Sequence, residues 1–493
     1  MTNRNGDERA PIASTDRPNV IFILSDDQGI WAAGCYGNPE IRTPNIDRLA
    51  AAGVQFANFF ASTPVCSPSR ATYLTGRIAS QNGVHDWIRG QEVGPSAPLY
   101  LDGEVCYTDI LAEAGWTCGI SGKWHLGASQ LAQHGFSHWF VHQFGGGLYN
   151  NAPMVRNGQL VDEPGYVTNV ITDDALAFID RHGAGPDPFY LSVHYTAPHS
   201  PWTGHPQEIV DSYDDCEFES CPQEPLHPWA TDFTKQFMGN REMLKGYFAA
   251  VTAMDTDVGR IVDRLEELGI AKTTLMIFAG DNGFSCGHHG FWGKGNGTSP
   301  LNMYENSVKV PFIVSQPGRI PAGAVEEALV SNYDFMPTLI DYLDLELPQD
   351  RNLPGRSFLA ELLGGESGGR EHVVVYDEYG PTRMVRNARW KYVHRYPDGP
   401  NELFDLESDP GERNNLIEAG EHARRIAEMR GVLEDWFTTY VDPEKDGVRH
   451  EITGAGQLGP IRSTGNVDAE FFAGDPWSAG PGGWEGDEGQ SRI

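Results

Sequence analysis

The chain has 493 residues, of which 40% are hydrophobic and 11% aromatic, enough to bury the core of one large domain and a smaller one. Its 68 acidic residues against 36 basic ones give a formal net charge of −32. This charge disfavours nucleic acid and anionic membranes as partners by Coulomb repulsion. A local cationic pocket for a small anion is still compatible with it.

The first 18 residues are polar and lack the apolar segment of a signal peptide, so they predict a disordered N-terminal arm. No run of about 18 apolar residues occurs anywhere in the sequence, which predicts that the chain has no membrane span. From the sequence as written we expect a cytoplasmic protein, with export left open. No feature of the sequence indicates an oligomeric state.

The apolar run NVIFILSDD, residues 19–27, predicts a parallel strand buried on both faces. Further buried strands are expected at residues 117–121, 189–196, 275–280 and 310–315. Helical patterns lie at residues 43–52, 107–114, 167–181, 245–268 and 334–343. This alternation predicts an α/β domain over residues 19–365, with helices on both faces of one sheet.

A Gly-rich stretch at residues 362–371 predicts a domain boundary near residue 365. Short segments of alternating character follow it, and then an amphipathic pattern at residues 421–440. Together they predict a smaller α+β domain within residues 366–493. The part after about residue 442 is rich in Gly, Pro and Asp, and we expect it to extend over the surface as a tail.

Two pairs of oxygen-bearing side chains follow two of the expected strands. Asp26 and Asp27 follow the first strand, and Asp281 and Asn282 follow the strand at residues 275–280. Adjacent carboxylates repel each other unless a cation lies between them, and an all-oxygen set suits Ca²⁺ or Mg²⁺. Acidic residues are also common in turns after strands. Two such pairs at two strand ends favour a metal site.

Basic side chains are expected at the same edge of the sheet, where α/β proteins bind their ligands. The candidates are Arg70, Lys123, His125, His199 and Lys294. Lys123 and His125 are two residues apart, so in an extended segment both would point to one face. Each candidate alone could be a solvated or structural group. Together, in a protein this acidic, they indicate a bound tetrahedral oxyanion.

The seven cysteines are an odd number, and no C-x-x-C pair gives the usual zinc spacing. The sequence is equally compatible with a local disulfide between Cys216 and Cys221 and with free thiols at both positions. Ordinary buried or half-buried thiols are expected at four other positions: Cys35, Cys106, Cys118 and Cys286. Cys66 is different, because it precedes Pro68 and Arg70 in a short, specific pattern.

The stretch CSPSRATYLTGR, residues 66–77, resembles the signature of the type I sulfatases, a family of the alkaline phosphatase superfamily. The motifs DDQG, GKWHLG, PHSP, GDNG, WGKG and ELFDLESDPGERNNL occur in the family's order, so the resemblance covers most of the chain. It implies a large alkaline-phosphatase-like α/β domain with a mixed, mostly parallel sheet. It also implies a smaller C-terminal α+β domain with a short antiparallel sheet.

The resemblance further implies that a formylglycine-generating enzyme converts Cys66 to Cα-formylglycine (3-oxoalanine). The ligands of one divalent cation, Ca²⁺ first and Mg²⁺ as the alternative, would be Asp26, Asp27, Asp281, Asn282 and the converted Cys66. Arg70 would stabilise the hydrated aldehyde, and Lys123 would hold both it and a sulfate oxygen. His125 would act as a base on the hydrate, while His199 and Lys294 would bind sulfate and assist the leaving oxygen.

Two departures from the family pattern stand out. Lys309 occupies a position where many relatives have Arg, although both side chains are cations. Residues 296–302, NGTSPLN, form a longer link than is usual between the lysine loop and the following YE, and we expect this link to reshape the pocket rim.

The expected reaction is hydrolysis of a sulfate monoester. One hydroxyl of the hydrated aldehyde attacks sulfur, and the other then loses its proton and expels sulfate, so the aldehyde is regenerated. Family analogy favours a small anionic sulfate ester of a carbohydrate as substrate. Candidate rim residues are His85, Asp86, Trp87, Tyr149, Trp202 and residues 214–227, with core or surface packing as an equal alternative.

Two other functions are compatible with the sequence. A phosphodiesterase or phosphonate monoester hydrolase could use the same site. A catalytically silent sulfated-sugar-binding protein is the second alternative, and the intact set of metal, nucleophile and cationic residues argues against it.

Overall fold

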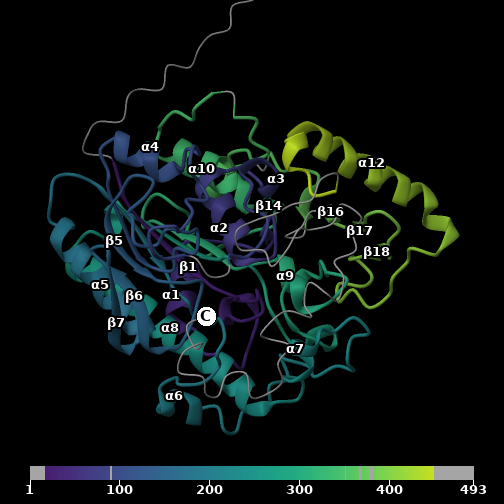
Figure 1. Ribbon diagram of the computed structural model, residues 1–493, viewed down its shortest axis with the longest axis horizontal. Coiled ribbons are helices and arrows are strands. Elements are labelled where there is room, and N and C mark those ends of the chain that lie inside the picture. Colours follow the sequence, from purple (N-terminus) through teal and green to yellow (C-terminus); the bar gives the residue numbers. More distant parts are fainter. Residues whose placement is uncertain (1–16, 89–91, 350, 366–367, 377–380, 449–493) are drawn as a thin grey trace, which may run out of the picture.

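The computed structural model describes residues 17–88, 92–349, 351–365, 368–376 and 381–448 (Figure 1). The expected N-terminal arm, apart from its last two residues, lies outside the described residues. The expected tail lies outside them from residue 449 onward.

A ten-stranded sheet forms the centre of the large α/β part. In spatial order its strands are β13 (Ala324–Glu326), β2 (Val54–Phe56), β12 (Phe312–Ser315), β9 (Thr274–Gly280), β1 (Asn19–Ser25), β8 (Phe189–His194), β4 (Thr117–Gly122), β5 (Phe136–His142), β6 (Asn150–Arg156) and β7 (Gln159–Tyr166). Strands β9, β1, β8, β4 and β5 form a parallel block. Strands β12 and β6 pair antiparallel with the two ends of this block. The predicted mixed, mostly parallel sheet is therefore confirmed.

Both faces of β1 are buried, which is why its sequence is a continuous apolar run. Val20, Phe22 and Leu24 pack on one face, and Ile21 and Ile23 pack on the other. The first face is covered by α2 (Cys66–Thr75), α4 (Tyr107–Glu113), α10 (Phe335–Tyr342) and α11 (Leu359–Leu362). The second face is covered by α1 (Pro44–Ala51), α5 (Val167–His182) and α8 (Arg241–Glu267).

Several element boundaries differ by a few residues from the sequence-based expectation, and two of the differences have a clear cause. Helix α8 begins four residues earlier than its apolar pattern indicates, because the side chain of Asn240 caps it by accepting a hydrogen bond of 3.3 Å from the Met243 amide. Strand β12 begins two residues later than expected, because the Val310 amide donates instead to the carbonyl of Phe59 in β3 (Phe59–Phe60).

The remaining short helices and strands lie in the segments between these larger elements. They are α3 (Ala79–Asn82), α6 (Gln207–Asp211), β10 (Ser285–Cys286), α7 (Asp232–Lys235), β11 (Trp292–Gly293), α9 (Glu305–Val308) and β14 (Val330–Ser331). No helix in the described part of the chain has the length and apolar content needed to cross a bilayer.

A four-stranded antiparallel sheet forms the smaller C-terminal domain, drawn in green and yellow in Figure 1. Its strands are β15 (Val373–Tyr376), β16 (Thr382–Arg386), β17 (Trp390–Arg395) and β18 (Glu402–Asp405). Helix α12 (Ala423–Tyr440) buries Met429, Leu433 and Phe437 in the core shared with this sheet. The expected antiparallel domain is confirmed, whereas the boundary at residue 365 stays a prediction.

A buried ion network joins the C-terminal sheet to the large domain. Nζ of Lys391 in β17 lies 2.6 Å from Glu412 Oε1 and 3.2 Å from Oε1 of Glu305 in α9. Burial alone would raise the pKa of Glu305, but the charges of Arg386, Lys391 and Lys309 hold it below its ordinary value. Lys309, the departure from the family pattern, thus takes part in this structural network.

Replacing Lys391 by methionine is expected to lower the free energy of unfolding by about 3–5 kcal/mol, because two buried carboxylates then lose their shared cation. The matched control is Arg424→Met, which removes an exposed ion pair with Glu428 on α12 and is expected to cost less than about 0.5 kcal/mol. Urea unfolding of the three proteins measures both changes. A Lys391→Met protein as stable as the control would show that the network does not hold the domains together.

Candidate active site

The two pairs of oxygen ligands meet because their strands are parallel neighbours in register, with Ser25 of β1 opposite Gly280 of β9. The next residues of both strands therefore emerge at the same edge of the sheet. Carboxylate oxygens of Asp26, Asp27 and Asp281 lie within 4.8 Å of one another, and all three residues are buried. Asp27 and Asn282 are 255 positions apart in the sequence. The pairing of β1 with β9 brings these two residues, and with them the three carboxylates, to one place.

This cluster has the composition of a site for a hard divalent cation. Nδ2 of Asn282 donates to Asp27 Oδ1 at 2.7 Å, and its Oδ1 is buried with no hydrogen-bond partner among the described residues. Burial, and after it the negative charge of Asp26, raises the pKa of Asp281. Three crowded carboxylates and an unpaired amide oxygen are oxygen donors of the kind that Ca²⁺ and Mg²⁺ prefer, so the residues present fit such an ion.

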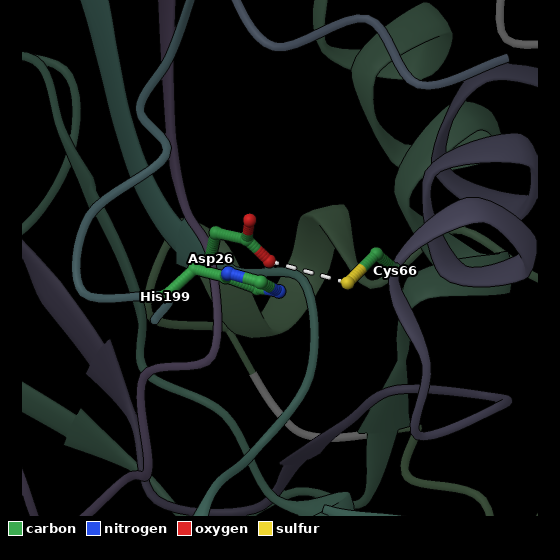
Figure 2. A group of neighbouring side chains, drawn as sticks. All are labelled: Asp26, Cys66 and His199. Carbon is green, nitrogen blue, oxygen red and sulfur yellow. Dashed lines mark hydrogen bonds between the residues drawn. The ribbon is translucent and has the colours of Figure 1, made fainter. Parts of the chain in front are cut away.

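Cys66 is the first residue of α2, and that helix is held against the end of β9. Tyr73 donates from its hydroxyl to the carbonyl of Gly280 at 3.0 Å, and Ser69 Oγ donates to the carbonyl of Asp281. These contacts bring the Cys66 side chain to the acidic cluster, where Sγ donates to Asp26 Oδ1 at 3.3 Å (Figure 2).

The chemical environment of the Cys66 thiol is unsuited to thiolate chemistry. Burial, and after it the negative charge of Asp26, raises the pKa of this thiol, even though Lys294 Nζ donates to Sγ at 2.9 Å. A neutral thiol is a weak nucleophile, because the thiolate is the reactive form. The unmodified side chain therefore lies at the centre of the site without being activated.

Each carboxylate of the cluster has its own buried cation. Lys123 Nζ lies 2.5 Å from Asp26 Oδ2, and Lys294 Nζ lies 2.5 Å from Asp27 Oδ1. Arg70 donates from Nε to Asp281 Oδ2 at 3.0 Å. The guanidinium of Arg70 also donates to the Lys123 carbonyl at 3.3 Å, so it fixes the backbone of a second site residue. The three cations predicted at this edge therefore surround the acidic cluster.

His125 lies at the site, although not for the reason that its spacing suggested. The segment after β4 is not extended, because Gly122 and His125 have φ values of 117° and 58°. His125 Nε2 lies 2.8 Å from the carbonyl of Ile88, and a carbonyl only accepts, so Nε2 carries the proton. Nδ1 is buried with a free lone pair and no partner within the described ranges. Burial, and after it the charge of Lys123, lowers the pKa of His125, which leaves a neutral imidazole able to accept a proton.

His199 lies beside the acidic cluster, next to Asp26 and Cys66 (Figure 2). Its Nε2 is 3.7 Å from Asp27 Oδ2, and its Nδ1 is 2.7 Å from the carbonyl of Ser200. The carbonyl of His199 accepts a hydrogen bond of 2.8 Å from the Tyr149 hydroxyl. The His199 side chain is 22% exposed, whereas that of Lys123 is fully buried, so His199 is the candidate nearer to solvent.

Several candidate rim residues belong to the core instead. Trp202 is buried against Phe237, Phe284 and Trp292. Tyr149 is buried and supports the backbone of His199, so it is a positioning residue and not part of a rim. His85 and Asp86 are buried as well, whereas Trp87 is partly exposed.

The segment of residues 214–227 and the loop of residues 296–302 have structural contacts. Lys245 Nζ lies 2.5 Å from Oδ1 of Asp214, and Cys216 and Cys221, like the other five cysteines, are free thiols. Asn302 donates from Nδ2 to the carbonyls of Lys294 and Gly295 at 3.0 and 3.1 Å, which fixes the lysine loop. A reshaped rim at this loop stays a prediction.

Two buried histidines at this edge of the sheet were not predicted from the sequence: His194, the last residue of β8, and His142. His142 is the last residue of β5, the next parallel strand after β4, and it is buried. The charges of Lys123, His199 and Asp26 all act on it. Its place within the aromatic run FSHWFVH suggested only a buried strand, whereas its position at a strand end was the signal that could have identified it.

Three comparisons with known proteins give consistent results for the chain as a whole. A family model described as "Sulfatase" matches residues 18–345, and one described as "N-sulphoglucosamine sulphohydrolase, C-terminal" matches residues 287–438. An N-acetylglucosamine-6-O-sulfatase of Bacteroides thetaiotaomicron is 27% identical over 88% of this chain and 88% of its own length. An N-acetylgalactosamine-6-sulfatase of Canis lupus familiaris is 31% identical over 71% of this chain and 66% of its own length. A solved protein in complex with its substrate D-glucosamine-2-N,6-O-disulfate has a TM-score of 0.75 and 26% identity, covering 87% of this chain and 99% of that one.

Proposed function

The chain belongs to the type I sulfatase family of the alkaline phosphatase superfamily and is a sulfatase, and from this premise we propose that it releases sulfate from sulfated carbohydrates, with 6-O-sulfated amino sugars as the first substrates to test. The observation that carries the proposal is the buried cluster around Cys66, in which three carboxylates each pair with their own cation. The two relatives described above are named for 6-sulfated N-acetylhexosamines, which supports this choice of sugar.

The acidic residues would hold one divalent cation, with Ca²⁺ preferred over Mg²⁺. Its ligands would be Asp26, Asp27, Asp281, Asn282 and residue 66. When bound, such an ion withdraws electron density from the oxygens it holds and offsets their negative charge. Lys123 and Lys294 would then be released in part from the carboxylates and become available to sulfate oxygens, while Arg70 would stabilise the hydrate formed at residue 66.

We propose further that Cys66 is converted to formylglycine before catalysis, by a formylglycine-generating enzyme of the host. The neutral, buried thiol supports this, because it could not itself attack sulfur efficiently. A hydrated aldehyde supplies one hydroxyl to attack sulfur and a second whose deprotonation expels sulfate.

Proton transfer in this scheme falls to the two histidines. His125 has a free lone pair on Nδ1, so it would accept a proton from the residue-66 hydrate. His199 lies nearer to solvent, so it would donate a proton to the alcohol oxygen as that oxygen leaves sulfur.

A substrate panel tests the proposed function. We expect sulfate release from N-acetylglucosamine-6-sulfate or N-acetylgalactosamine-6-sulfate, and also from 4-nitrophenyl sulfate. Hydrolysis of a phosphate diester or a phosphonate monoester is expected to be slower by at least about 10²-fold in kcat/KM, a difference of roughly 2.7 kcal/mol in transition-state stabilisation. Faster hydrolysis of either phosphorus ester would favour the phosphodiesterase or phosphonate hydrolase alternative. Binding of sulfated sugar without turnover by the converted protein would favour the silent binding protein.

A further inference from the structure

The edge of the parallel block that carries the active site includes two histidines at strand ends that the proposed reaction does not use, His194 of β8 and His142 of β5. His194 Nδ1 lies 3.2 Å from the Lys123 carbonyl, so its ring supports the backbone of the site. Strand β5 lies beside β4, with Val141 opposite Gly122. The next residues on the two strands are His142 and Lys123, so His142 extends the row of strand-end side chains by one strand. The charges of Lys123, His199 and Asp26 that act on His142 reflect this proximity.

The loop after β5 passes directly over three histidines because it contains three successive glycines. A Cβ atom on Gly145 would lie 2.2 Å from His125 Nε2, and one on Gly146 would lie 3.2 Å from His199 Nδ1. A Cβ atom on Gly147 would lie 3.4 Å from His142 Nε2. Successive Cα atoms are about 3.8 Å apart, so the three imidazoles border one short piece of backbone.

None of these three glycines has a φ in the left-handed region that favours glycine. The requirement at these positions is therefore for space beside the histidines and not for an unusual backbone conformation. A loop with larger side chains would occupy the volume next to His125 and His199. The absence of side chains on Gly145–Gly147 therefore lets the backbone of this loop lie directly against the three imidazoles, so that the loop borders the site on this side.

The His142 ring is fixed in place, with one nitrogen left for a ligand. Nδ1 lies 2.9 Å from the Phe144 carbonyl, and Nε2 makes no hydrogen bond to any residue in the described part of the chain. Burial lowers the pKa of His142 to about 4, so the ring is neutral at neutral pH. A neutral imidazole suits a neutral hydroxyl or acetamido group and not a second sulfate.

We propose that His142 and Gly145–Gly147 form the side of the pocket that selects the alcohol part of the ester, with Nε2 of His142 hydrogen-bonding a neutral polar group of the sugar beside the sulfate. This inference rests on the proposed function, since it assigns a substrate contact to that same site. It makes His142 a specificity-determining residue, while cleavage of the S–O bond stays with the groups around residue 66.

The test compares two esters in the His142→Ala protein: N-acetylglucosamine-6-sulfate and 4-nitrophenyl sulfate, which has no hydroxyl or acetamido group beside the sulfate. We expect the ratio of kcat/KM for the sugar to kcat/KM for the aryl ester to fall about 10- to 100-fold, the usual cost of losing a substrate hydrogen bond. His142→Gln is expected to recover part of the ratio, because an amide can still form the hydrogen bond. The matched control is His138→Ala on the same strand, where the ring contacts Asp174 Oδ2 instead, and its ratio is expected to be unchanged.

The possible outcomes separate the two proposals. A His142→Ala ratio equal to that of wild type, or a His142→Gln ratio no higher than that of His142→Ala, would overturn the role of His142 and leave the proposed function standing. A converted wild-type protein that releases sulfate from neither ester would overturn the proposed function itself. Wild-type activity on the aryl ester alone would overturn both the carbohydrate substrate and the role of His142.

The glycines provide a second, independent test with the same two esters. Gly145→Ala is expected to lower kcat on both by about 10²-fold, because its Cβ must displace the His125 ring. The Cβ atom added by Gly147→Ala would make only an ordinary contact with His142. We therefore expect this substitution to change kcat on the aryl ester by less than about threefold. Equal effects of the two substitutions on the aryl ester would contradict the arrangement of the loop over the histidines.

Discussion

Cys66→Ala is expected to lower kcat on every sulfate ester by about 10⁴-fold or more, because alanine has no thiol for the conversion and its Cβ therefore cannot become the aldehyde carbon. Cys66→Ser is expected to be as inactive in a host whose converting enzyme acts on cysteine. A serine hydroxyl could at best form a stable sulfate ester, which has no second hydroxyl to expel sulfate. The surrounding ion pairs do not involve the residue-66 side chain, so both variants should fold.

Sulfate release measures the loss, and urea unfolding checks that the variants are folded. The matched control is Cys216→Ala, which removes a partly exposed free thiol whose Sγ contacts Glu40 Oε1 at 3.7 Å and no residue of the acidic cluster, and it should retain the wild-type rate. Wild-type turnover by Cys66→Ala would rule out the proposed mechanism, because no other described cysteine lies in the acidic cluster.

Asp27→Asn is expected to lower kcat by about 10²- to 10³-fold and to reduce the bound Ca²⁺ below one ion per chain. The substitution keeps the shape of the side chain but removes one of the three negative charges that balance the cation. It also removes the partner of Lys294, which lies 2.5 Å from Asp27 Oδ1. Metal analysis of the purified protein and sulfate release provide the two readouts.

The control for this substitution is Asp263→Asn, which neutralises an exposed carboxylate paired with Arg48 on the protein surface. It should leave both metal content and kcat unchanged. Chelation of wild-type protein followed by addition of Ca²⁺ or Mg²⁺ then identifies the ion that restores activity. Full activity after chelation, with no metal detected, would contradict the assignment of the acidic cluster as a metal site.

The sequence predicted the central strands β1, β4, β8 and β9 because they are buried on both faces, whereas β6 and β7, which are partly exposed, were not predicted. A run such as NVIFILS is continuous in apolar residues only when helices cover both sides of a sheet, as they do for β1. The oxygen ligands were found for a related reason. Asp26 and Asp281 directly follow such runs, and parallel strands in register bring the residues after them to one edge.

The sequence was less informative where the backbone leaves the regular elements. His125 reaches the site through left-handed φ values at Gly122 and His125, which an argument from extended spacing does not anticipate. Trp202 looked like a rim residue because aromatic side chains also line sugar sites, but neighbouring aromatic residues bury it. His142 was missed because a single polar residue in an aromatic run resembles an ordinary strand interior.

The central claim is that residue 66 acts as formylglycine, and the most direct test measures its conversion and the activity together. Preparations made with and without co-expressed formylglycine-generating enzyme are digested, and mass spectrometry gives the fraction of the peptide containing residue 66 that carries an aldehyde instead of a thiol. The account predicts that the rate of sulfate release is proportional to this fraction and falls to the level of Cys66→Ala when the thiol is intact. Equal rates in fully converted and fully unconverted protein would contradict it.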